Sequence, residues 1–232
     1  MSGEKQNEVV WPAGYRINPR HDDLPADLLE AFGKIPVAVA GDCMGRSIGT
    51  MGLKSYHGNK IMCGQAVTVR VRPGDNLMVH KALMMAQAGD VIVIDGGGDL
   101  TQAVIGGLIR TTAQTKKLGG FVIDGAIRDL AEWAEGDMPV FARGHTHRGP
   151  SKEGPGEINV AVAVGGLVVH PGDLILGDLD GVIAIRAPDA AALLPKTLAH
   201  LEREAKIRET NLKGTADPER FDAILRAKGL PV

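Results

Sequence analysis

The sequence from Gly106 to Glu132, GGLIRTTAQTKKLGGFVIDGAIRDLAE, decides how the rest of the chain can fold. It holds two adjacent glycines, a segment of helical length, the apolar run FVID, and then Arg128 and Asp129 at the start of another predicted helix. A helix followed by a buried strand is typical of a β-α-β crossover. The stretch therefore predicts parallel strands, with backbone amides near the glycines and an arginine beside a carboxylate after the strand.

A unit of the same kind precedes this stretch. Residues 66–73, AVTVRVRP, alternate apolar and polar side chains, which predicts a half-exposed strand. Asp75 or Asn76 is placed to cap a helix that ends at Gly89. The apolar run VIVID, residues 91–95, then predicts a buried strand.

The two units are joined by DGGGD, residues 95–99. A helix is expected to follow this run, to be interrupted at Gly106 and Gly107, and to resume at Leu108. Asp95 and Asp99 are expected to end the strand and cap that helix, and the alternative is a role in a metal or substrate site.

The second half of the chain is richer in short strands. Residues 138–144 predict one short strand, and residues 158–186 contain four β-like runs joined by GG, HPGD and DLDG turns, as in an antiparallel meander. Residues 188–232 are expected to form a C-terminal helical extension. Its first helix is amphipathic and becomes strongly charged, which suits either a partner subunit or a solvated face.

The first part of the chain is less informative. Residues 1–24 are expected to form an arm without regular structure, followed by a helix with Pro25 in its first turn and a short helix over residues 37–45. Residues 45–58 read as a glycine-rich loop, and a surface connection is favoured over a loop that covers a site. The order of elements, with parallel units first and a β-rich layer second, predicts one α/β domain spanning residues 1–232.

Composition narrows the class of protein. The chain has 232 residues and a formal net charge of −2, which gives no basic surface for nucleic acid. The first residues lack an apolar signal core and no apolar run is long enough for a membrane span, so a cytoplasmic location is expected. Cys43 and Cys63 lack a CxxC pattern and are expected to be reduced thiols.

The first candidate for chemistry is the Gly106–Gly107 break. A helix that restarts at Leu108 leaves its first amides unpaired, and these amides attract a carboxylate or a phosphate. Leu108 and Ile109 would be the donors. The alternative interpretation is that the glycines only let two helices approach each other or kink.

Arg128 and Asp129 are the second candidate, because ligands collect at the carboxyl ends of strands in open α/β sheets. Arginine offers a planar fork for a carboxylate or an enolate oxygen, and aspartate offers a hard oxygen ligand for Mg²⁺ or Mn²⁺. The competing account makes Asp129 an N-cap and Glu132 its partner in a capping box. No capping rule requires Arg128, which favours a functional role for it.

Other site types find little support. The chain has no phosphate-binding GxxxxGK[ST], no dinucleotide-binding GxGxxG with a downstream acidic residue, and no GxSxG nucleophile elbow. His80 reads as a half-buried helical histidine, and His145 and His147 lack a third ligand at zinc spacing.

Several blocks of sequence together resemble the family that joins 4-hydroxy-4-methyl-2-oxoglutarate aldolases to the RraA-type regulators of RNase E. They are GDNLMVHKAL, VIVIDGGGDL, the Gly106–Gly107 break, FVIDGAIRDLAE, GPGEINVAV and GDLDGVIAI, and they cover most of residues 35–210. The most specific is Gly107 followed, with twenty residues between, by Arg128–Asp129 and then Glu132. The resemblance implies a swivelling-type α-β-β-α sandwich with C-terminal helices, assembled as a homotrimer or homohexamer with sites between subunits.

The resemblance also implies a reaction and roles for residues. In the aldolases a divalent metal ion, bound largely through waters, activates a 2-keto acid, and a pyruvate enolate is the shared intermediate of retro-aldol cleavage and oxaloacetate decarboxylation. Carried over, Asp129 anchors Mg²⁺ or Mn²⁺, Arg128 stabilises the enolate, and the glycine-break loop at Gly107, Leu108 and Ile109 binds the substrate carboxylate. Glu204 on the C-terminal helix is the candidate for a catalytic glutamate that reaches a neighbouring subunit's site.

One position departs from the aldolases. Where they carry an acidic residue that engages metal-bound water, this chain has Gly107, and Asp99 or Glu132 is the candidate replacement. The leading hypothesis is thus a metal-dependent lyase of a small 2-keto acid. The alternatives are a non-catalytic regulatory protein of the RNase E inhibitor type and an enzyme of the same fold that acts on another acid.

Overall fold

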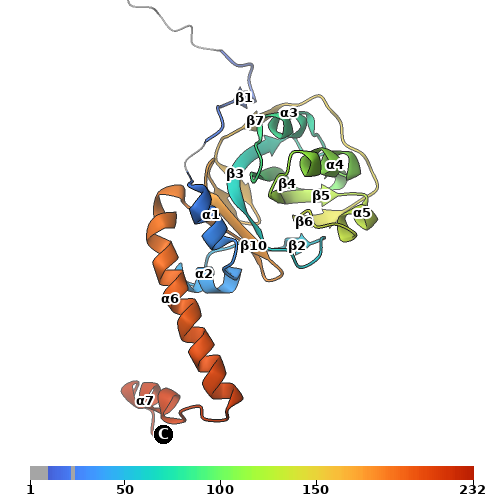
Figure 1. Ribbon diagram of the computed structural model, residues 1–232. Coiled ribbons are helices and arrows are strands. Elements are labelled where there is room, and N and C mark those ends of the chain that lie inside the picture. The colour runs from blue at the N-terminus through green and yellow to red at the C-terminus, as the bar shows by residue number, and fades with distance from the viewer. Residues whose placement is uncertain (1–9, 22–23) are drawn as a thin grey trace, which may run out of the picture.

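A computed structural model describes residues 10–21 and 24–232 (Figure 1). Its central feature is a mixed β-sheet whose parallel strands are β3 (Met62–Val71), β4 (Val91–Ile105), β5 (Gly120–Ile127) and β6 (Val140–His145). The sheet order is β1-β7-β3-β4-β5-β6-β2, with β1 (Tyr15–Ile17) and β7 (Gly156–Ile158) at one edge and β2 (Lys54–Ser55) at the other.

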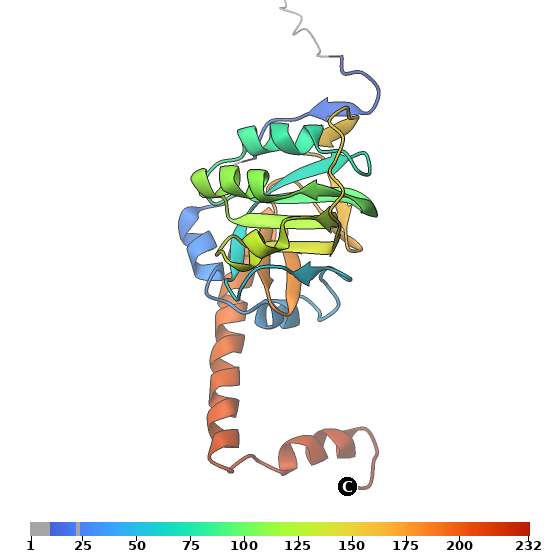
Figure 2. The same ribbon diagram turned by 90° about the vertical axis from the view of Figure 1, so that its right-hand side faces the viewer.

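Three crossover helices pack against one face of this sheet, as Figures 1 and 2 show. They are α3 (Leu77–Met85), α4 (Gly107–Thr115) and α5 (Leu130–Ala134). Alternate strand residues such as Ile92, Ile94 and Phe121 point into this helical layer and are fully buried there. Both predicted β-α-β units are therefore confirmed, and each brings a strand's carboxyl end and a helix's amino end to the same edge of the sheet.

The other face of the sheet carries the short strands of the second half. β8 (Val162–Val164) and β9 (Leu167–Val169) form one hairpin, and β10 (Leu174–Asp178) and β11 (Gly181–Ile185) form another. The predicted meander is wrong in one respect, because β9 does not pair with β10 and β10 pairs instead with the first half of β3. A third apolar cluster packs α1 (Ala26–Phe32), α2 (Val37–Cys43) and α6 (Ala187–Leu212) against β10 and β11.

Two expectations for the first strands are wrong. The strand predicted over residues 66–73 belongs to β3 and ends at Val71. Arg70 is exposed, but residues 66–69 and 71 are all buried, because helices cover one face of the strand and the short strands cover the other. The helix expected between Asp99 and Gly106 is instead the second half of β4. Register shifts between β4 and β5 at Asp95, Asp99 and Ala103 absorb the glycine run, so the chain stays extended up to Ile105.

The N-terminal arm also differs from its expectation. The described part of residues 1–24 contains β1, which pairs in parallel with β7, whereas residues 1–9 and 22–23 lie outside the described residues. Residues 45–58 are mostly loop but include β2, which pairs with β6.

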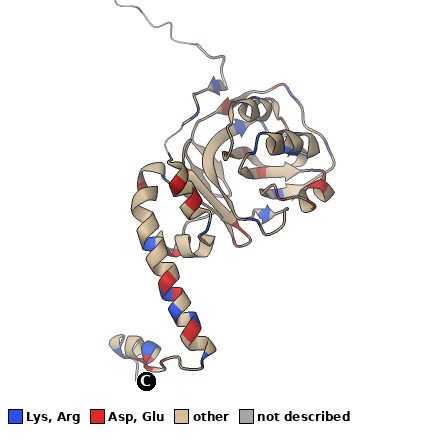
Figure 3. Ribbon diagram, in the orientation of Figure 1, with Lys and Arg blue, Asp and Glu red and all other residues tan. Residues whose placement is uncertain are grey.

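The C-terminal extension is confirmed as two helices, α6 and α7 (Glu219–Ala227). The first half of α6 packs on α1 and α2, and its second half, which is densely charged, projects away from the sheets (Figures 1 and 3). In the described part of the chain, no helix is both long enough and apolar enough to cross a membrane. The expected mixed α/β fold with C-terminal helices is thus present, and the swivelling-type assignment stays a prediction.

Asp75 fastens a long loop to the start of α3. Its side chain is 1% exposed, and it accepts hydrogen bonds from the amides of Leu77, Glu153 and Gly154 and from the Ser151 hydroxyl, at 2.7 to 3.1 Å. Burial alone would raise the pKa of this carboxyl, but the hydrogen bonds from Glu153, Ser151, Leu77 and Gly154 hold it below its usual value.

We expect Asp75→Asn to lower the free energy of unfolding by about 1–3 kcal/mol at pH 7, because an NH₂ group would face backbone donors. The carboxylate's folded pKa is depressed, so its contribution is present above the unfolded pKa of about 4 and is lost as pH falls through the folded value. Urea unfolding at pH 7 and pH 3 measures this, and the gap between the proteins should narrow at pH 3. A gap that is equal at both pH values would contradict the assignment.

Candidate active site

The two predicted site segments meet where β4 and β5 end. The Arg128 amide donates to Ile105 O at 3.1 Å, and the indole N–H of buried Trp133 donates to Arg128 O at 2.9 Å. These bonds place Arg128 and Asp129 directly beside Gly106 and the start of α4. The sequence prediction that the glycine break faces the arginine–aspartate pair is therefore supported by the geometry.

Asp129 has an unusual backbone, with φ 62° and ψ 45° in the left-handed region. It precedes α5, but its side chain makes no capping hydrogen bond to that helix, so the capping-box account of Asp129 and Glu132 is wrong. Instead its Oδ2 accepts the Gly107 amide of α4 at 2.8 Å and lies 3.6 Å from Arg128 Nε. The left-handed backbone turns the Asp129 side chain toward α4. Residues held in such sparsely populated conformations are concentrated at functional sites.

The two glycines serve close approach rather than a kink. A Cβ at Gly106 would lie 2.8 Å from Arg128 Cγ and would also collide with the Asp129 carboxylate, and a Cβ at Gly107 would lie 2.6 Å from the Glu132 carboxyl carbon. No side chain fits at either position without displacing these groups. The Glu132 carboxylate thus occupies the space into which a residue at 107 would project.

The amino end of α4 offers free donors. Its intrahelical hydrogen bonds begin with the Arg110 amide, which donates to Gly106 O at 3.1 Å. Gly107 is engaged by Asp129, so Leu108 and Ile109 are left with amides that have no acceptor among the described residues. These are the two donors predicted from the sequence, and their partial positive charge suits an anionic oxygen.

A pocket of about 100 Å³ opens beside these amides. Gly106, Leu108, Ile109 and Arg128 line one side, and Asn76, His80 and Lys152 are among the residues that complete it. Burial, and then the charge of Lys152, lower the pKa of His80, which keeps its ring neutral at pH 7. The pocket therefore combines two cationic side chains with free amides, as an anion site requires.

Asn76 lies in the wall of this pocket and fixes it to β4. Its amide nitrogen donates to Val104 O at 2.9 Å, whereas its Oδ1 is buried without a partner among the described residues. A buried oxygen without a donor costs about 1–3 kcal/mol.

A second hollow, of about 280 Å³, lies on the other side of Arg128 and is lined by Asp129, His145, Thr146 and His147. Arg128 borders both spaces, and its guanidinium packs so closely on Gly149 that a Cβ there would lie 2.9 Å from Nη1. The arginine thus stands between the anion pocket and the exposed side of Asp129.

The donors around Asp129 fit a divalent cation that keeps most of its waters. Its side chain is 40% exposed, and its Oδ1 has no donor among the described residues. The Glu132 carboxylate adds hard oxygen donors beside Gly107. Mg²⁺ and Mn²⁺ prefer oxygen ligands, and Mg²⁺ is commonly held by one or two carboxylates with water in the remaining positions.

Asp95 and Asp99 are not part of this arrangement. Asp95 accepts the amides of Gly97 and Ala163, and Asp99 accepts the amide and hydroxyl of Thr101. Since no helix follows them, the capping role is wrong, and each instead fixes the local course of β4. Asp99 is therefore the weaker of the two candidate replacements for an acid at position 107.

A partly buried ion pair was not predicted from the sequence. Asp124, in the middle of β5, bonds Arg143 of β6 and accepts the Gly165 amide at 2.8 Å. Burial would raise the pKa of Asp124, but the Arg143 and Gly165 hydrogen bonds and the arginine's charge lower it. The pair ties the β8–β9 hairpin to the central sheet.

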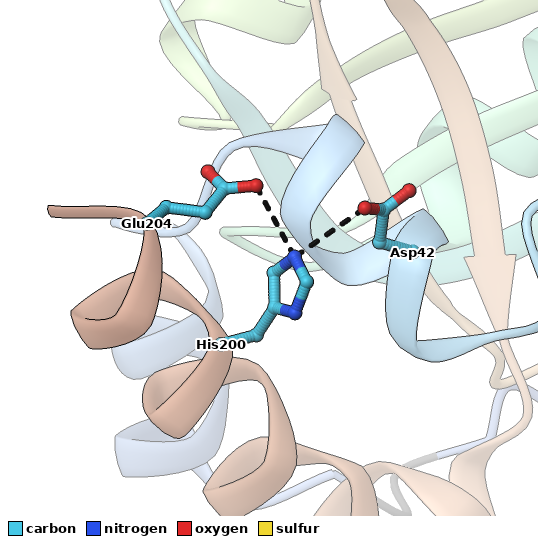
Figure 4. A group of neighbouring side chains, drawn as sticks. All are labelled: Asp42, His200 and Glu204. Carbon is cyan, nitrogen blue, oxygen red and sulfur yellow. Dashed lines mark hydrogen bonds and ion pairs between the residues drawn. The ribbon is translucent and has the colours of Figure 1, made fainter. Parts of the chain in front are cut away.

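Glu204 lies on α6, far from α5 in the same protomer (Figure 1). Its carboxylate contacts His200 Nε2 at 3.2 Å, and the same nitrogen lies 3.3 Å from Asp42 Oδ2 of α2 (Figure 4). Within residues 10–21 and 24–232, these three are the one group of three or more His, Cys, Asp or Glu side chains whose ligand atoms lie close enough together to share a metal ion. The predicted role of Glu204 in a neighbouring subunit's site stays a prediction.

Sequence reasoning missed Asn76, Lys152 and the contact between Glu132 and Gly107. The Asp-Asn pair before α3 was interpreted as a helix cap. Asp75 does accept the Leu77 amide at the start of α3, but it also bonds the loop that carries Lys152, and no capping bond comes from Asn76. The signal in the sequence was the pair Gly106–Gly107. Two residues without side chains allow the start of α4 to lie close to the segment that carries Arg128, Asp129 and Glu132.

The family model described as RraA-like, Aldolase/RraA, matches residues 26–184, which is more than half of the chain. The chain therefore belongs to the RraA-like family, which defines its class. The predicted family resemblance is confirmed.

Two named relatives and one solved structure illustrate what the chain is similar to. A putative 4-hydroxy-4-methyl-2-oxoglutarate aldolase of Halalkalibacterium halodurans is 43% identical over 160 residues, 68% of this chain and 76% of that protein. A 4-hydroxy-4-methyl-2-oxoglutarate aldolase of Thermus thermophilus is 38% identical over 138 residues, 60% of this chain and 84% of that protein. The crystal structure of Streptomyces coelicolor RraAS2, described as an unusual member of the RNase ES inhibitor RraA family, superposes with a TM-score of 0.75 at 24% identity, over 81% of this chain and 98% of that one. This last likeness concerns the fold alone.

Proposed function

We propose that the protein is a divalent-metal-dependent carbon–carbon lyase of a small 2-keto acid. The observation that carries the proposal is the junction at which Asp129 bonds the first amide of α4 while Arg128 and two free amides face one pocket. Relatives named as aldolases at 38–43% identity support the same reaction class. The substrates that suit it are 4-hydroxy-4-methyl-2-oxoglutarate and its analogues, which release pyruvate, and oxaloacetate.

The pocket supplies places for the carboxylates and the keto group of such a substrate. The amides of Leu108 and Ile109 receive the carboxylate next to the keto group, and Arg128 lies where it can hold the keto oxygen. Lys152, across the pocket, is placed for a second carboxylate.

Cleavage requires a proton to leave the C4 hydroxyl as the C4–O double bond forms and the C3–C4 bond breaks. The electron pair of that bond moves into the C2–C3 enolate, and later protonation at C3 gives pyruvate. Arg128 stabilises the negative oxygen of the enolate through its fixed guanidinium. A divalent cation held at Asp129, with Glu132 beside it, would supply Lewis-acid polarisation of the keto group.

Glu132 is the group we assign to proton transfer. Its carboxylate lies in the space that a side chain at position 107 would occupy. Glu132 therefore provides, at the same place, the carboxylate that an acidic residue at 107 provides in the aldolases. Gly107 is therefore compatible with lyase activity, because it makes room for Glu132.

We expect Glu132→Gln to lower kcat by about 10²–10⁴-fold, the usual range for loss of a general acid or base, with little change in KM. Pyruvate release measured at saturating substrate tests this. Glu135→Gln, an exposed exchange at the end of α5, is the matched control and should leave kcat within about twofold, as surface substitutions usually do. Equal kcat values for the wild type and Glu132→Gln would remove Glu132 from the reaction.

The direct test of the function is pyruvate release from 4-hydroxy-4-methyl-2-oxoglutarate and from oxaloacetate, with Mg²⁺ or Mn²⁺ and then with chelator. Turnover that the chelator abolishes and the metal restores is the expected result. No metal-dependent turnover of either substrate would overturn the specific proposal and would favour another acid substrate.

A non-catalytic role of the RNase E inhibitor type is the second candidate, favoured by the absence of an acid at Gly107. It would need a protein-binding surface and no metal dependence. Inhibition of RNase E by the protein, unchanged in Asp129→Asn and without lyase turnover, would establish it instead.

A homotrimer or homohexamer is part of the proposal. Leu198, Leu212, Phe221 and Ile224 on α6 and α7 are 48–83% exposed, which is much apolar surface for helices that project from the body. Light scattering coupled to gel filtration measures the subunit number.

A further inference from the structure

We propose that Asp42, His200 and Glu204 form a second metal site, suited to a transition-metal ion such as Zn²⁺, that joins α2 to α6. This site is separate from Asp129, and the proposal stands whether or not the protein is a lyase. Figure 4 shows the three side chains converging between the two helices.

The three ligands come from two elements that already pack together. Asp42 lies in the last turn of α2, and His200 and Glu204 lie one turn apart on one side of α6. The His200 side chain is 9% exposed, whereas those of Asp42 and Glu204 are 34% and 42% exposed. An ion can therefore enter from solvent while its nitrogen ligand stays fixed by packing.

The spacing of the donor atoms suits a small ion. His200 Nε2 lies 3.3 Å from Asp42 Oδ2 and 3.2 Å from Glu204 Oε1, and all donor atoms lie within 4.8 Å of one another. With metal–ligand bonds of about 2.0–2.2 Å, neighbouring ligands of a tetrahedral ion are about 3.3–3.6 Å apart. Small side-chain rotations would complete three sides of such a site and leave the fourth to water.

The chemistry of the donors selects the kind of ion. An imidazole nitrogen with two carboxylate oxygens suits Zn²⁺ and similar ions, whereas Mg²⁺ prefers oxygen ligands alone. We therefore expect Zn²⁺ or Co²⁺ to bind here and Mg²⁺ to bind poorly. This preference is opposite to that of the oxygen donors at Asp129 and Glu132.

Two arginines contact the proposed ligands in this structure. Arg46 Nη2 lies 3.1 Å from Asp42 Oδ2, and Arg203 bonds His200 Nδ1. Both arginines are exposed, the Arg46 side chain at 69%, and exposed ion pairs are worth only about 0–1 kcal/mol. A dication can displace them at small cost.

Metal binding also requires a change in which nitrogen of the His200 ring carries the proton. Because Arg203 donates to Nδ1, the neutral ring carries its proton on Nε2 and shares it with the two carboxylates. On metal binding that proton moves to Nδ1, Arg203 turns outward, and the Nε2 lone pair binds the ion. No net proton is released and no further reactant is needed.

The test is calorimetric titration of the chelator-treated, full-length protein with ZnCl₂, carried out in Asp129→Asn so that the other site is removed. We expect one Zn²⁺ to bind with micromolar or better affinity, and added His200→Asn to weaken binding at least about 100-fold, since even groups that only orient a ligand contribute 10–100-fold. Co²⁺ should give tetrahedral visible absorption bands in the first protein and not in the second. Glu202→Gln, an exposed exchange on the same helix, is the matched control and should bind as the parent does.

Asp42→Asn, on the other helix, provides a second variant in case His200→Asn does not fold, and it should also weaken Zn²⁺ binding. MgCl₂ in place of ZnCl₂ should produce no comparable heat. Zn²⁺ binding that is equal in Asp129→Asn with and without His200→Asn or Asp42→Asn would overturn the proposal, as would no Zn²⁺ binding by Asp129→Asn.

Discussion

Asp129→Asn is expected to lower kcat/KM by at least about 10³-fold and to abolish the dependence of activity on divalent metal, since it removes both a charged ligand and local electrostatic stabilisation. Asparagine is the replacement that best isolates the effect of the charge, for two reasons. It tolerates the left-handed backbone of this position, φ 62°, and its Oδ1 can still accept the Gly107 amide at the start of α4. The variant therefore keeps the junction and loses the negative charge.

Steady-state rates measured over a Mg²⁺ and Mn²⁺ concentration series test this expectation. Asp137→Asn is the matched control, because Asp137 is an exposed aspartate just after α5, and it should behave as the wild type does. A wild-type metal dependence in Asp129→Asn would show that the cation is held elsewhere.

Arg128→Ala is expected to reduce kcat by about 10²–10³-fold or more, the range seen when one donor to a developing oxyanion is removed. Arg128 borders both the anion pocket and the hollow beside Asp129, and its backbone is held by Ile105 and Trp133 rather than by its own side chain. Truncation therefore removes the guanidinium without removing the junction. The subunit number, measured by light scattering, should be the same as in the wild type.

Arg128→Lys separates charge from shape, because lysine keeps the charge and loses the planar fork. Compared with Arg128→Ala, the Arg128→Lys variant should bring KM back toward the wild-type value more than it does kcat. Partial recovery of Arg128→Ala activity on adding guanidinium ion would show that the fork itself acts, and Arg148→Lys in the neighbouring loop is the control. A kcat near that of the wild type in Arg128→Ala would assign the enolate to another donor.

The sequence predicted the parallel units because an alternating strand pattern, AVTVRVRP, and two short apolar runs, VIVID and FVID, are separated by segments of helical length. It failed for residues 99–105, where a glycine run suggested a loop and helix, although DLTQAVI contains strand-favouring residues. These residues form a strand because they pair with β5, and that pairing continues through several register shifts. Pairing with a strand elsewhere in the chain cannot be read from the local sequence.

The candidate site was predictable to the extent that it lies in one contiguous segment. Arg128 and Asp129 follow a strand, and that position alone pointed to a site. The contact of Glu132 with Gly107 depends on the distance at which α4 and α5 emerge from the sheet, and the pocket needs a loop fixed by Asp75. Such distances are set by tertiary packing, and no periodicity in the sequence encodes them.

Asp75 has a consequence for the pocket. Its neighbour Asn76 lies in the pocket wall, and the amides of Glu153 and Gly154, which it holds, follow directly after Lys152 on the facing wall. The backbone adds to this hold, because the Asn76 amide donates to Ser151 O at 3.0 Å and the Ser151 amide donates to Gly74 O at 2.9 Å. The position of the lysine wall therefore depends on residues 74–76, so a change at Asp75 would be felt in the pocket as well as in the stability of the fold.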